Sequence, residues 1–313
     1  MREEFTSRRS EWAPAYLALE QSGELARREE ALRAIYRECR LCPRACQAER
    51  DRGATGVCGA TAQAKIYSAH PHYGEEPPLT GRRGSGTIFF SHCNLLCSFC
   101  QNWEIAHSGE GSYISDRTLG RIMVELQEAG CHNINLVTPT HVVPNIVSAV
   151  RHAIALGLRV PLVYNCGGYE SLEVVRLLDN IVDIYLADCK YMDSSLASKY
   201  SSGAADYPER ALAAMEEMHR QVGDLVVDEE GVALRGLMIR HLVLPNGLAG
   251  TDRFVEFVSH RLSPLTYVNI MAQYRPEHRA YRFPELSRPI SLDELRQALR
   301  LAAEAGLQRV GRF

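Results

Sequence analysis

From Gly86 onward, short apolar runs alternate with amphipathic stretches, and this alternation limits the possible folds more than any other feature of the chain. A strand followed by a helix, repeated six times, indicates parallel βα units. Six units suit a partial (β/α)6 barrel of the TIM type better than a closed eightfold barrel. The predicted strands cover residues 87–90, 134–137, 160–164, 182–187, 236–244 and 267–272, with a short final strand at 308–312.

Helical periodicity between these runs predicts helices over residues 116–129, 143–156, 170–179, 208–222, 252–262 and 291–305. Residues that often cap helices lie at the boundaries: Asp116, Asp252 and Ser291 at the starts, and Gly130, Gly157 and Gly306 near the ends. Ligands of such folds bind at the carboxyl ends of the strands, so the residues there are the first candidates for a functional site.

Residues 1–80 have a different character, and we predict an N-terminal extension there, followed by the barrel at 81–313. Within the extension, residues 15–40 show helical spacing of apolar side chains, including Leu17, Leu25 and Leu32. Residues 39–85 lose this periodicity and are rich in Cys, Gly and Pro. Such a segment needs something other than an apolar core to order it.

Composition excludes several classes of protein. The chain of 313 residues is 46% hydrophobic and carries a formal charge of −3, so it lacks the basic field of a nucleic-acid-binding protein. Charged residues interrupt the first fifteen positions, where a signal peptide would be apolar. No apolar run is long enough to span a membrane, so we expect a cytoplasmic protein without a membrane partner. In that compartment, its ten cysteines indicate metal ligands rather than disulfides.

Three cysteines follow the first predicted strand directly. Cys93, Cys97 and Cys100 form C-x3-C-x2-C within TIFFSHCNLLCSFCQNW (residues 87–103). Spacings this short let one loop wrap a single metal centre. Three thiolates on a four-iron cluster leave one iron without a protein ligand, and a small molecule can bind there. A zinc loop or a chance grouping of thiols is the alternative.

This motif, after the first strand of a six-unit βα array, resembles the radical S-adenosylmethionine superfamily. Proteins described as pyruvate formate-lyase activating enzyme-like are similar over about residues 36–275. The likeness is carried by HYGEEPPLTGRRGSGTIFFSHCNLLCSFCQNWEIAH (72–107), NINLVTPTHVVP (133–144), VDIYLADCKY (182–191) and IRHLVLPNG (239–247). The resemblance implies a [4Fe–4S] cluster whose open iron binds S-adenosylmethionine. It also implies reductive cleavage to methionine and a 5′-deoxyadenosyl radical, which abstracts hydrogen from a substrate.

The resemblance implies roles at other strand ends as well. Asp188 and Lys190 match the Asp-x-Lys of glycyl-radical activases, in which the lysine pairs with the methionine carboxylate, and Arg240 resembles an activase arginine that faces the cofactor. Strand alternation turns His241 away from Arg240, toward a structural role. Lys190 joins the three cysteines as a predicted catalytic residue. The predicted cofactor-binding set is Asn102, Thr138, Thr140, Asn165, Asp188, Lys190, Arg240 and Gln273.

The chain departs from the resemblance at two strand ends. Residues 138–141 read Thr-Pro-Thr-His, where many superfamily members carry a Gly-Gly-Glu-like motif. Near residue 273, where activases have a histidine, this chain has Gln273. These departures leave the substrate open.

Several residues remain open between a functional and a structural role. A buried pair without a ligand is the alternative for Asp188 and Lys190. His141 either reaches substrate or caps the following helix, and Cys166 is a candidate substrate-side thiol at a strand end. For the adjacent carboxylates Glu75 and Glu76, we favour a solvated turn over an acid–base role.

A second set of cysteines, Cys39, Cys42, Cys46 and Cys58, has the spacing C-x2-C-x3-C-x11-C. Four thiolates leave no open position, so this set predicts a closed site. Both structural zinc and a second [4Fe–4S] cluster satisfy the spacing. Arg44 and Arg50 lie within the same segment and are expected to balance the thiolate charge.

Two enzyme functions remain. The first is a glycyl-radical enzyme activase, whose radical takes hydrogen from a glycine of a partner protein. The second is a radical enzyme that modifies a small molecule or another protein, and the N-terminal extension and the departures from the activase pattern favour it. The resemblance implies anaerobic chemistry and a one-electron donor such as flavodoxin or ferredoxin. A non-enzymatic zinc or electron-transfer protein would not explain the open three-cysteine loop.

Overall fold

The chain folds around one mixed sheet in the computed structural model, which describes residues 6–311. The strand order is β10-β9-β8-β6-β5-β4-β2-β1-β3, and β7 pairs with β8. Along this order the neighbours from β10 to β2 are parallel, whereas β1 is antiparallel to β2 and to β3, and β7 is antiparallel to β8. The strands are β1 (Lys65–His72), β2 (Ser85–Phe90), β3 (Ser112–Tyr113), β4 (Ile134–Val137), β5 (Leu162–Cys166), β6 (Ile184–Cys189), β7 (Val226–Val227), β8 (Ala233–Leu242), β9 (Tyr267–Met271) and β10 (Val310–Gly311).

The predicted partial barrel is confirmed, because all six expected strands form and pair in parallel. The expected final strand is shorter than predicted, since β10 covers Val310–Gly311 and Arg312 lies outside the described residues. The helices are α1 (Tyr16–Gln21), α2 (Glu24–Ala34), α3 (Pro77–Thr80), α4 (Trp103–Ala106), α5 (Asp116–Glu128), α6 (Val143–Ala155), α7 (Leu172–Leu177), α8 (Ser194–Tyr200), α9 (Tyr207–Val222), α10 (Thr251–Phe257) and α11 (Leu292–Glu304).

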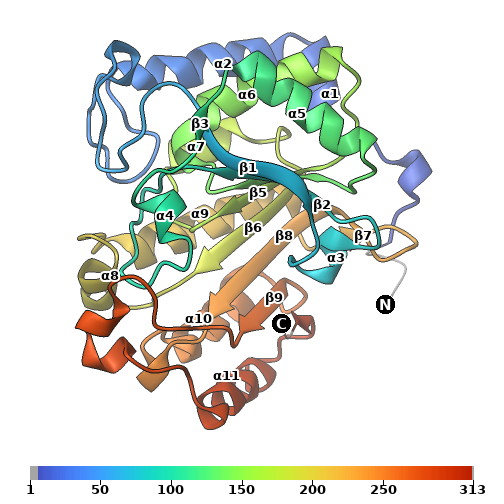
Figure 1. Cartoon of the computed structure of the whole chain (residues 1–313). Coiled ribbons are helices and arrows are strands. Elements are labelled where there is room, and N and C mark those ends of the chain that lie inside the picture. Colours follow the sequence, from blue (N-terminus) through green and yellow to red (C-terminus); the bar gives the residue numbers. More distant parts are fainter. Residues whose placement is uncertain (1–5, 312–313) are drawn as a thin grey trace.

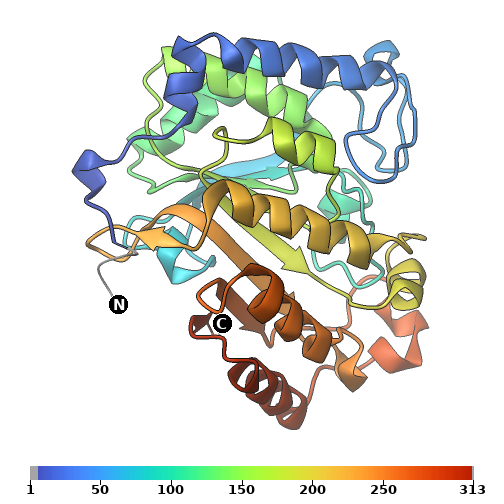
Figure 2. The same cartoon turned by 180° about the vertical axis from the view of Figure 1, so that it is seen from behind.

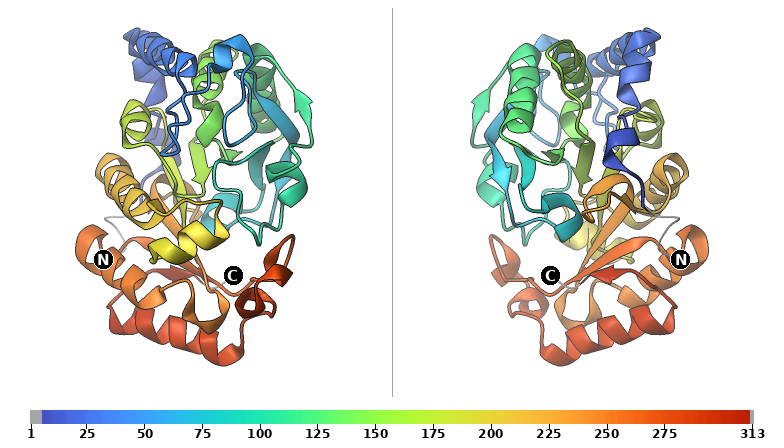
Figure 3. Two further views of the ribbon diagram at one scale, coloured as in Figure 1. Left: turned by 90° about the vertical axis from the view of Figure 1, so that its left-hand side faces the viewer. Right: turned by 90° about the vertical axis from the view of Figure 1, so that its right-hand side faces the viewer.

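The helices cover the outer face of the sheet. In Figure 1, α2, α5 and α6 lie above the strands, and α10 and α11 lie below them. Figure 2 shows α9 running across the back of the sheet, where it packs on β6 and β8. The N-terminal helices and the C-terminal helices therefore occupy opposite ends of the molecule (Figure 3). No helix in the range 6–311 is both long and apolar enough to cross a membrane.

Helix boundaries follow local capping chemistry. Ser291 caps α11 as predicted, because its side chain accepts from the Glu294 N–H while Glu294 reaches back to the cap, completing a capping box. Two predicted caps are wrong by one or two residues. Ser115 caps α5 in place of Asp116, and Gly250 precedes α10 in place of Asp252. In both cases the aspartate lies in the first turn, where its charge is favourable.

The N-terminal segment is joined closely to the barrel. Although β1 falls within the predicted extension, it pairs along β2. Its sequence, KIYSAHPH, contains a proline and two histidines, so alternation alone did not reveal it. Helix α2 packs on α6, and the buried Tyr36 hydroxyl donates to Asn145 Oδ1 at 2.6 Å.

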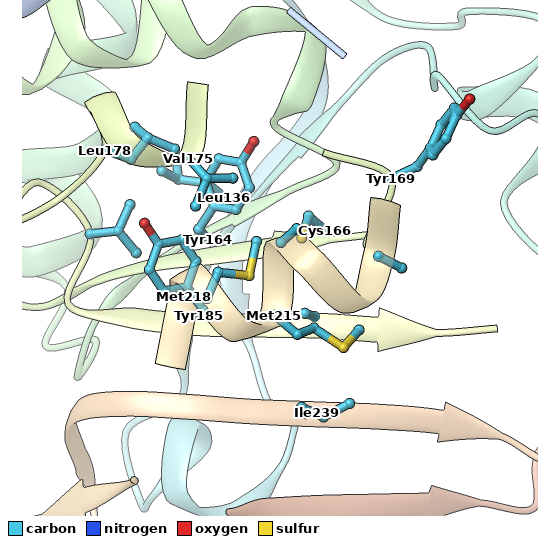
Figure 4. Packing of buried hydrophobic residues seen from close by; sticks show 14 of the residues in the cluster. Leu136, Tyr164, Cys166, Tyr169, Val175, Leu178, Tyr185, Met215, Met218 and Ile239 are labelled. Atoms are coloured by element: carbon cyan, nitrogen blue, oxygen red, sulfur yellow. The ribbon is translucent and has the colours of Figure 1, made fainter. Parts of the chain in front are cut away.

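The core lies between the sheet and the outer helices. Figure 4 shows Tyr164 and Tyr185 of neighbouring strands packing with Met215 and Met218 of α9. Inside the barrel, a smaller apolar group closes the end where the parallel strands begin: Leu79, Val163, Ile184, Leu186, Leu225, Ala233 and Met238. Polar side chains follow farther along the same strands. The barrel interior therefore changes from apolar to polar toward the carboxyl ends.

Gly236 in β8 offers a test of this packing. Its φ is +130°, and an added Cβ would lie 2.5 Å from Leu225 Cα, whereas Gly231 has φ +80° and open space around it. Gly231→Ala is expected to cost about 1–2 kcal/mol of unfolding free energy for the left-handed conformation alone. Gly236→Ala is expected to cost a further ~1–3 kcal/mol, because backbone must move. Urea denaturation of both variants measures the difference, and equal losses would contradict the close contact.

Candidate active site

A cavity of about 230 Å³ opens at the carboxyl ends of the parallel strands. In Figure 1, the ends of β6 and β8 point toward the side of the molecule where α4 and α8 lie. All three cysteines of the first motif line this cavity, together with all but one of the predicted cofactor-binding residues: Asn102, Thr138, Asn165, Asp188, Lys190, Arg240 and Gln273. Residues from the ends of six strands, or from the loops that follow them, thus meet at one place.

The loop after β2 presents the three thiols. Burial is the main reason that the pKa of Cys93 is raised to about 11, and the charge of the neighbouring Cys97 adds to the rise. Burial and the charges of Cys93 and Cys97 raise the pKa of Cys100 to about 12. Binding of a metal centre there requires loss of the thiol protons, so it is expected to release protons.

A buried ionic group forms the wall opposite the cysteines. Asp188 Oδ2 accepts from Lys190 Nζ at 2.7 Å, and Asp188 Oδ1 accepts from Arg240 Nε at 2.7 Å. Arg240 also donates to Asn165 Oδ1 and lies 3.4 Å from Glu75 Oε2. The parallel pairing of β6 with β8 places Asp188 directly opposite Arg240.

Charge balance in this group keeps the carboxylate ionised. Burial is the largest effect on Asp188 and raises its pKa, but Arg240 and Lys190 together lower the pKa below its usual value. Burial is the largest effect on Lys190 and lowers its pKa, but Asp188 and Cys97 together raise the pKa overall. Lys190 and Arg240 therefore face the cavity as two cations beside the ionised Asp188, with Glu75 next to Arg240, and cations at this place suit a ligand that carries a carboxylate.

The glycines after β5 permit a close approach of two backbones. Gly168 has φ +81°, and an added Cβ would lie 2.3 Å from the Asp188 carbonyl oxygen. The Tyr207 hydroxyl accepts from the Lys190 N–H at 3.0 Å and lies 2.9 Å from the Asp188 carbonyl. These contacts hold the ends of β5 and β6 together, which positions Asn165 beside Asp188.

Two predicted residues lie away from the cavity lining. The Thr140 hydroxyl donates to buried Glu170 at 2.7 Å, and His141 Nε2 lies 2.7 Å from the Ser91 carbonyl oxygen. His141 does not cap the following helix, because Val142 occupies the N-cap position of α6. The predicted structural role of His241 is confirmed, since its ring is buried and bonded to Cys189 O and Thr251. The candidate thiol Cys166 lines the cavity.

The favoured interpretation of Glu75 and Glu76 as a solvated turn is wrong. Glu76 is 4% exposed and accepts from Asn269 Nδ2 at 2.9 Å, while Glu75 faces Arg240. Burial, opposed by Arg240, raises the pKa of Glu75. The following α3 turns the chain beneath the barrel, so both carboxylates enter its interior instead of facing water. Sequence position before the first strand did not reveal this.

Sequence reasoning missed other residues of the cavity. Phe99 lies within the C-x2-C spacing and packs edge-on against Tyr191 and Tyr274, so its aromatic character was the available signal. His92 precedes Cys93 at φ +76°, a conformation uncommon for residues other than glycine. Such strain often accompanies function, but no local sequence pattern indicates it.

The four-cysteine set forms a second region on the N-terminal segment. Burial is the largest effect on Cys42 and raises its pKa to about 12. A backbone hydrogen bond opposes this rise, and the charges of Cys58 and Cys39 add to it. Burial also raises the pKa of Cys58, with contributions from Cys39 and Cys46. These thiols therefore influence one another.

Arg50 lies buried beside this set without a carboxylate partner among the described residues. It is 1% exposed, donates to His141 O at 2.8 Å and lies 3.8 Å from Cys39 Sγ, with its guanidinium 4.4 Å from the centre of the Tyr36 ring. A buried cation is costly unless an anion balances it. Thiolates at the neighbouring cysteines would supply that charge.

Over residues 6–311, no group of three or more His, Cys, Asp or Glu side chains is arranged to hold a metal ion. In a four-iron cluster each thiolate binds a different iron, so the three sulfurs at the cavity need not converge on one ion. The geometry adds no support for zinc at the four-cysteine set.

Comparison with known proteins yields one sequence relative of note. MJ0674 of Methanocaldococcus jannaschii, an uncharacterized protein, is 30% identical over 291 residues, which cover 90% of this chain and 79% of that protein. The chain belongs to the family of MJ0674. No family model matches it.

Two solved structures are similar to parts of this chain. A domain of pyruvate-formate lyase-activating enzyme from Bacteroides vulgatus is 13% identical with a TM-score of 0.36, covering 63% of this chain and 91% of that chain. SuiB of Streptococcus suis bound to S-adenosylmethionine is 11% identical with a TM-score of 0.49, covering 71% of this chain and 48% of the other.

Buried Glu170 makes stability depend on pH. Burial, opposed by hydrogen bonds from Thr140 and Tyr164, raises its pKa from 4.5 to about 7. The folded state thus keeps a proton that the unfolded chain loses, so its stability is fullest below pH 4.5 and falls as pH rises to about 7. Glu170→Gln is expected to remove this loss, gaining on the order of a few kcal/mol over the wild type between these limits.

Chemical denaturation at several pH values measures the gain. Glu173→Gln is the matched control, because Glu173 lies three residues away with its side chain 51% exposed. Its difference from the wild type is expected to stay constant. A constant difference for Glu170→Gln would contradict the buried protonated carboxyl.

Proposed function

We propose that this protein is a radical S-adenosylmethionine enzyme, with a [4Fe–4S] cluster held by Cys93, Cys97 and Cys100. One observation carries the proposal: three thiols and the ionic group of Asp188, Lys190 and Arg240 line one cavity. When bound, the cluster and S-adenosylmethionine supply reductive cleavage to methionine and a 5′-deoxyadenosyl radical.

The protein's own residues bind and orient the cofactor. Lys190 offers a cation for the methionine carboxylate, while Asp188 holds the Lys190 ammonium and the Arg240 guanidinium in place. Asn165 has its amide fixed by Arg240, so it presents a defined polar group to the cavity. Phe90, Leu95 and Phe99 add apolar surface that limits access of water to the reacting atoms.

The substrate belongs to one of two classes. The Asp-x-Lys spacing and Arg240 favour an activase that generates a glycyl radical on a partner enzyme. Gln273 in place of a histidine and the closely joined N-terminal segment favour a small molecule or another protein instead. Either reaction requires a one-electron donor such as flavodoxin or ferredoxin.

Anaerobically reconstituted protein, mixed with dithionite and S-adenosylmethionine, is expected to form 5′-deoxyadenosine. Cys97→Ala is expected to lose the cluster at the cavity and at least a hundredfold of this activity, because the loop then keeps only two of its three cluster ligands. Cys131→Ala is the control, since Cys131 is a buried thiol outside both sets. Product formation is measured by liquid chromatography with iron analysis. A wild-type protein that holds the cluster but forms no 5′-deoxyadenosine would refute the proposal.

At the N-terminal set, we propose a closed metal site at Cys39, Cys42, Cys46 and Cys58, either zinc or a second [4Fe–4S] cluster. Losing a ligand is expected to release the metal, and thiols that regain their protons no longer balance the charge of buried Arg50. Cys42→Ala is therefore expected to lower the melting temperature by several degrees, on the order of a few kcal/mol. Metal analysis separates zinc from iron. Calorimetry with Cys131→Ala as the control checks the loss, and unchanged stability and metal content in Cys42→Ala would exclude the site.

A further inference from the structure

Arg44 lies between two cysteines of the N-terminal set, yet its side chain reaches the loop that carries the other three cysteines. All four of its hydrogen bonds go to backbone carbonyl oxygens. Nε donates to Asn94 at 2.8 Å, and Nη2 donates to Leu95 at 3.4 Å and to Ser201 at 2.9 Å. Nη1 donates to Ser202 at 2.6 Å. No carboxylate in the described part of the chain pairs with Arg44.

The first of these bonds bears on Cys93. The Asn94 carbonyl and the Leu95 N–H belong to one planar peptide unit, so a contact that fixes the oxygen also fixes the direction of the N–H. This N–H donates to Cys93 Sγ at 3.4 Å. A cation on the oxygen polarises the unit and strengthens the N–H as a donor. Arg44 therefore both orients and strengthens a hydrogen bond to this sulfur.

The second branch bears on Cys97. Arg44 holds the Ser201 carbonyl, and the hydroxyl of the same residue lies 3.2 Å from Cys97 Sγ and 3.1 Å from the Tyr191 hydroxyl. The Tyr200 carbonyl, one residue earlier, accepts from the Ser98 N–H at 2.7 Å. Cys93 and Cys97 thus each have a polar partner that Arg44 anchors.

We propose that Arg44 is a positioning residue that raises the reduction potential of the cluster at Cys93, Cys97 and Cys100. This inference rests on the proposed function. Hydrogen bonds to ligand sulfurs tune the potential of an iron–sulfur cluster, and they stabilise the state with more negative charge. The step concerned is uptake of one electron from the external donor, in which no bond forms or breaks. Because Arg44 belongs to residues 39–58, the fold of the four-cysteine segment controls how readily the cluster accepts that electron.

The test is an anaerobic redox titration followed by electron paramagnetic resonance. The signal that changes on addition of S-adenosylmethionine identifies the cluster at the cavity and separates it from any cluster at the N-terminal set. In Arg44→Ala, the ratio of reduced to oxidised cluster at a fixed potential is expected to fall about tenfold, a shift of about 59 mV to more negative potential for one electron. Iron content is expected to match the wild type.

Arg40→Ala is the matched control. Arg40 lies on the same segment and contacts the barrel through Glu173 at 3.2 Å, but its side chain is 49% exposed and does not reach the cysteine loop. The reduction potential of the cavity cluster in Arg40→Ala is expected to equal that of the wild type. A wild-type potential in Arg44→Ala would overturn the proposal, as would an equal shift in Arg40→Ala.

If circular dichroism shows that Arg44→Ala does not fold, Arg44→Lys replaces it, because lysine keeps the charge but cannot hold four carbonyl oxygens. A smaller shift of the same sign supports the role of Arg44, and a wild-type potential in folded Arg44→Lys overturns it. Failure of the proposed function is a different result. It would appear in the wild type as a signal unaffected by S-adenosylmethionine and as absence of 5′-deoxyadenosine.

Discussion

The ionic contact of Asp188 with Lys190 and Arg240 is the interaction on which the cavity depends. Removing three charges from water is costly, and the cost is offset only when each charge has a well-placed partner. Here Arg240 lies opposite Asp188 on the adjacent parallel strand, and Lys190 follows Asp188 by two residues along the chain, so the backbone supplies the alignment. The apolar group around Leu79 and Met238 closes the barrel beneath them. The result is a set of rigid charged groups that face the mouth of the barrel, where a charged ligand would replace water.

Guanidinium groups make several of the contacts that join the N-terminal segment to the barrel. Arg33 pairs with Asp116 of α5, Arg50 donates to the carbonyl of His141, and Arg44 holds the cysteine loop. Arginine suits this task because its planar fork donates several hydrogen bonds in fixed directions. A lysine at the same positions would offer a single charged point. These contacts add directional hydrogen bonds to the apolar packing of Leu25, Leu32 and Ile35, which also holds the segment against the barrel.

Much of the fold could be predicted from local pattern. The alternation of apolar runs and amphipathic segments located all six parallel strands, because burial on both faces leaves a strong apolar signal in such strands. The antiparallel β1 was not predicted, because it contains a proline and two histidines and most of its side chains are only partly buried or exposed, which leaves no clear apolar pattern. The cysteine spacing and the Asp-x-Lys pattern identified residues that do line one cavity. Thr140 fitted the same pattern, but its hydroxyl bonds Glu170 instead.

By itself, the sequence determined the order of strands and helices, the two cysteine sets and the strand ends where chemistry was expected. These properties depend on periodicity and spacing within short segments. Only the tertiary structure decided that Glu75 and Glu76 enter the barrel, that Arg50 lies buried with no carboxylate partner within residues 6–311, and that Arg44 reaches the other cysteine loop. Each of these depends on which distant segments meet, and the local sequence around a residue carries no record of its neighbours across the fold.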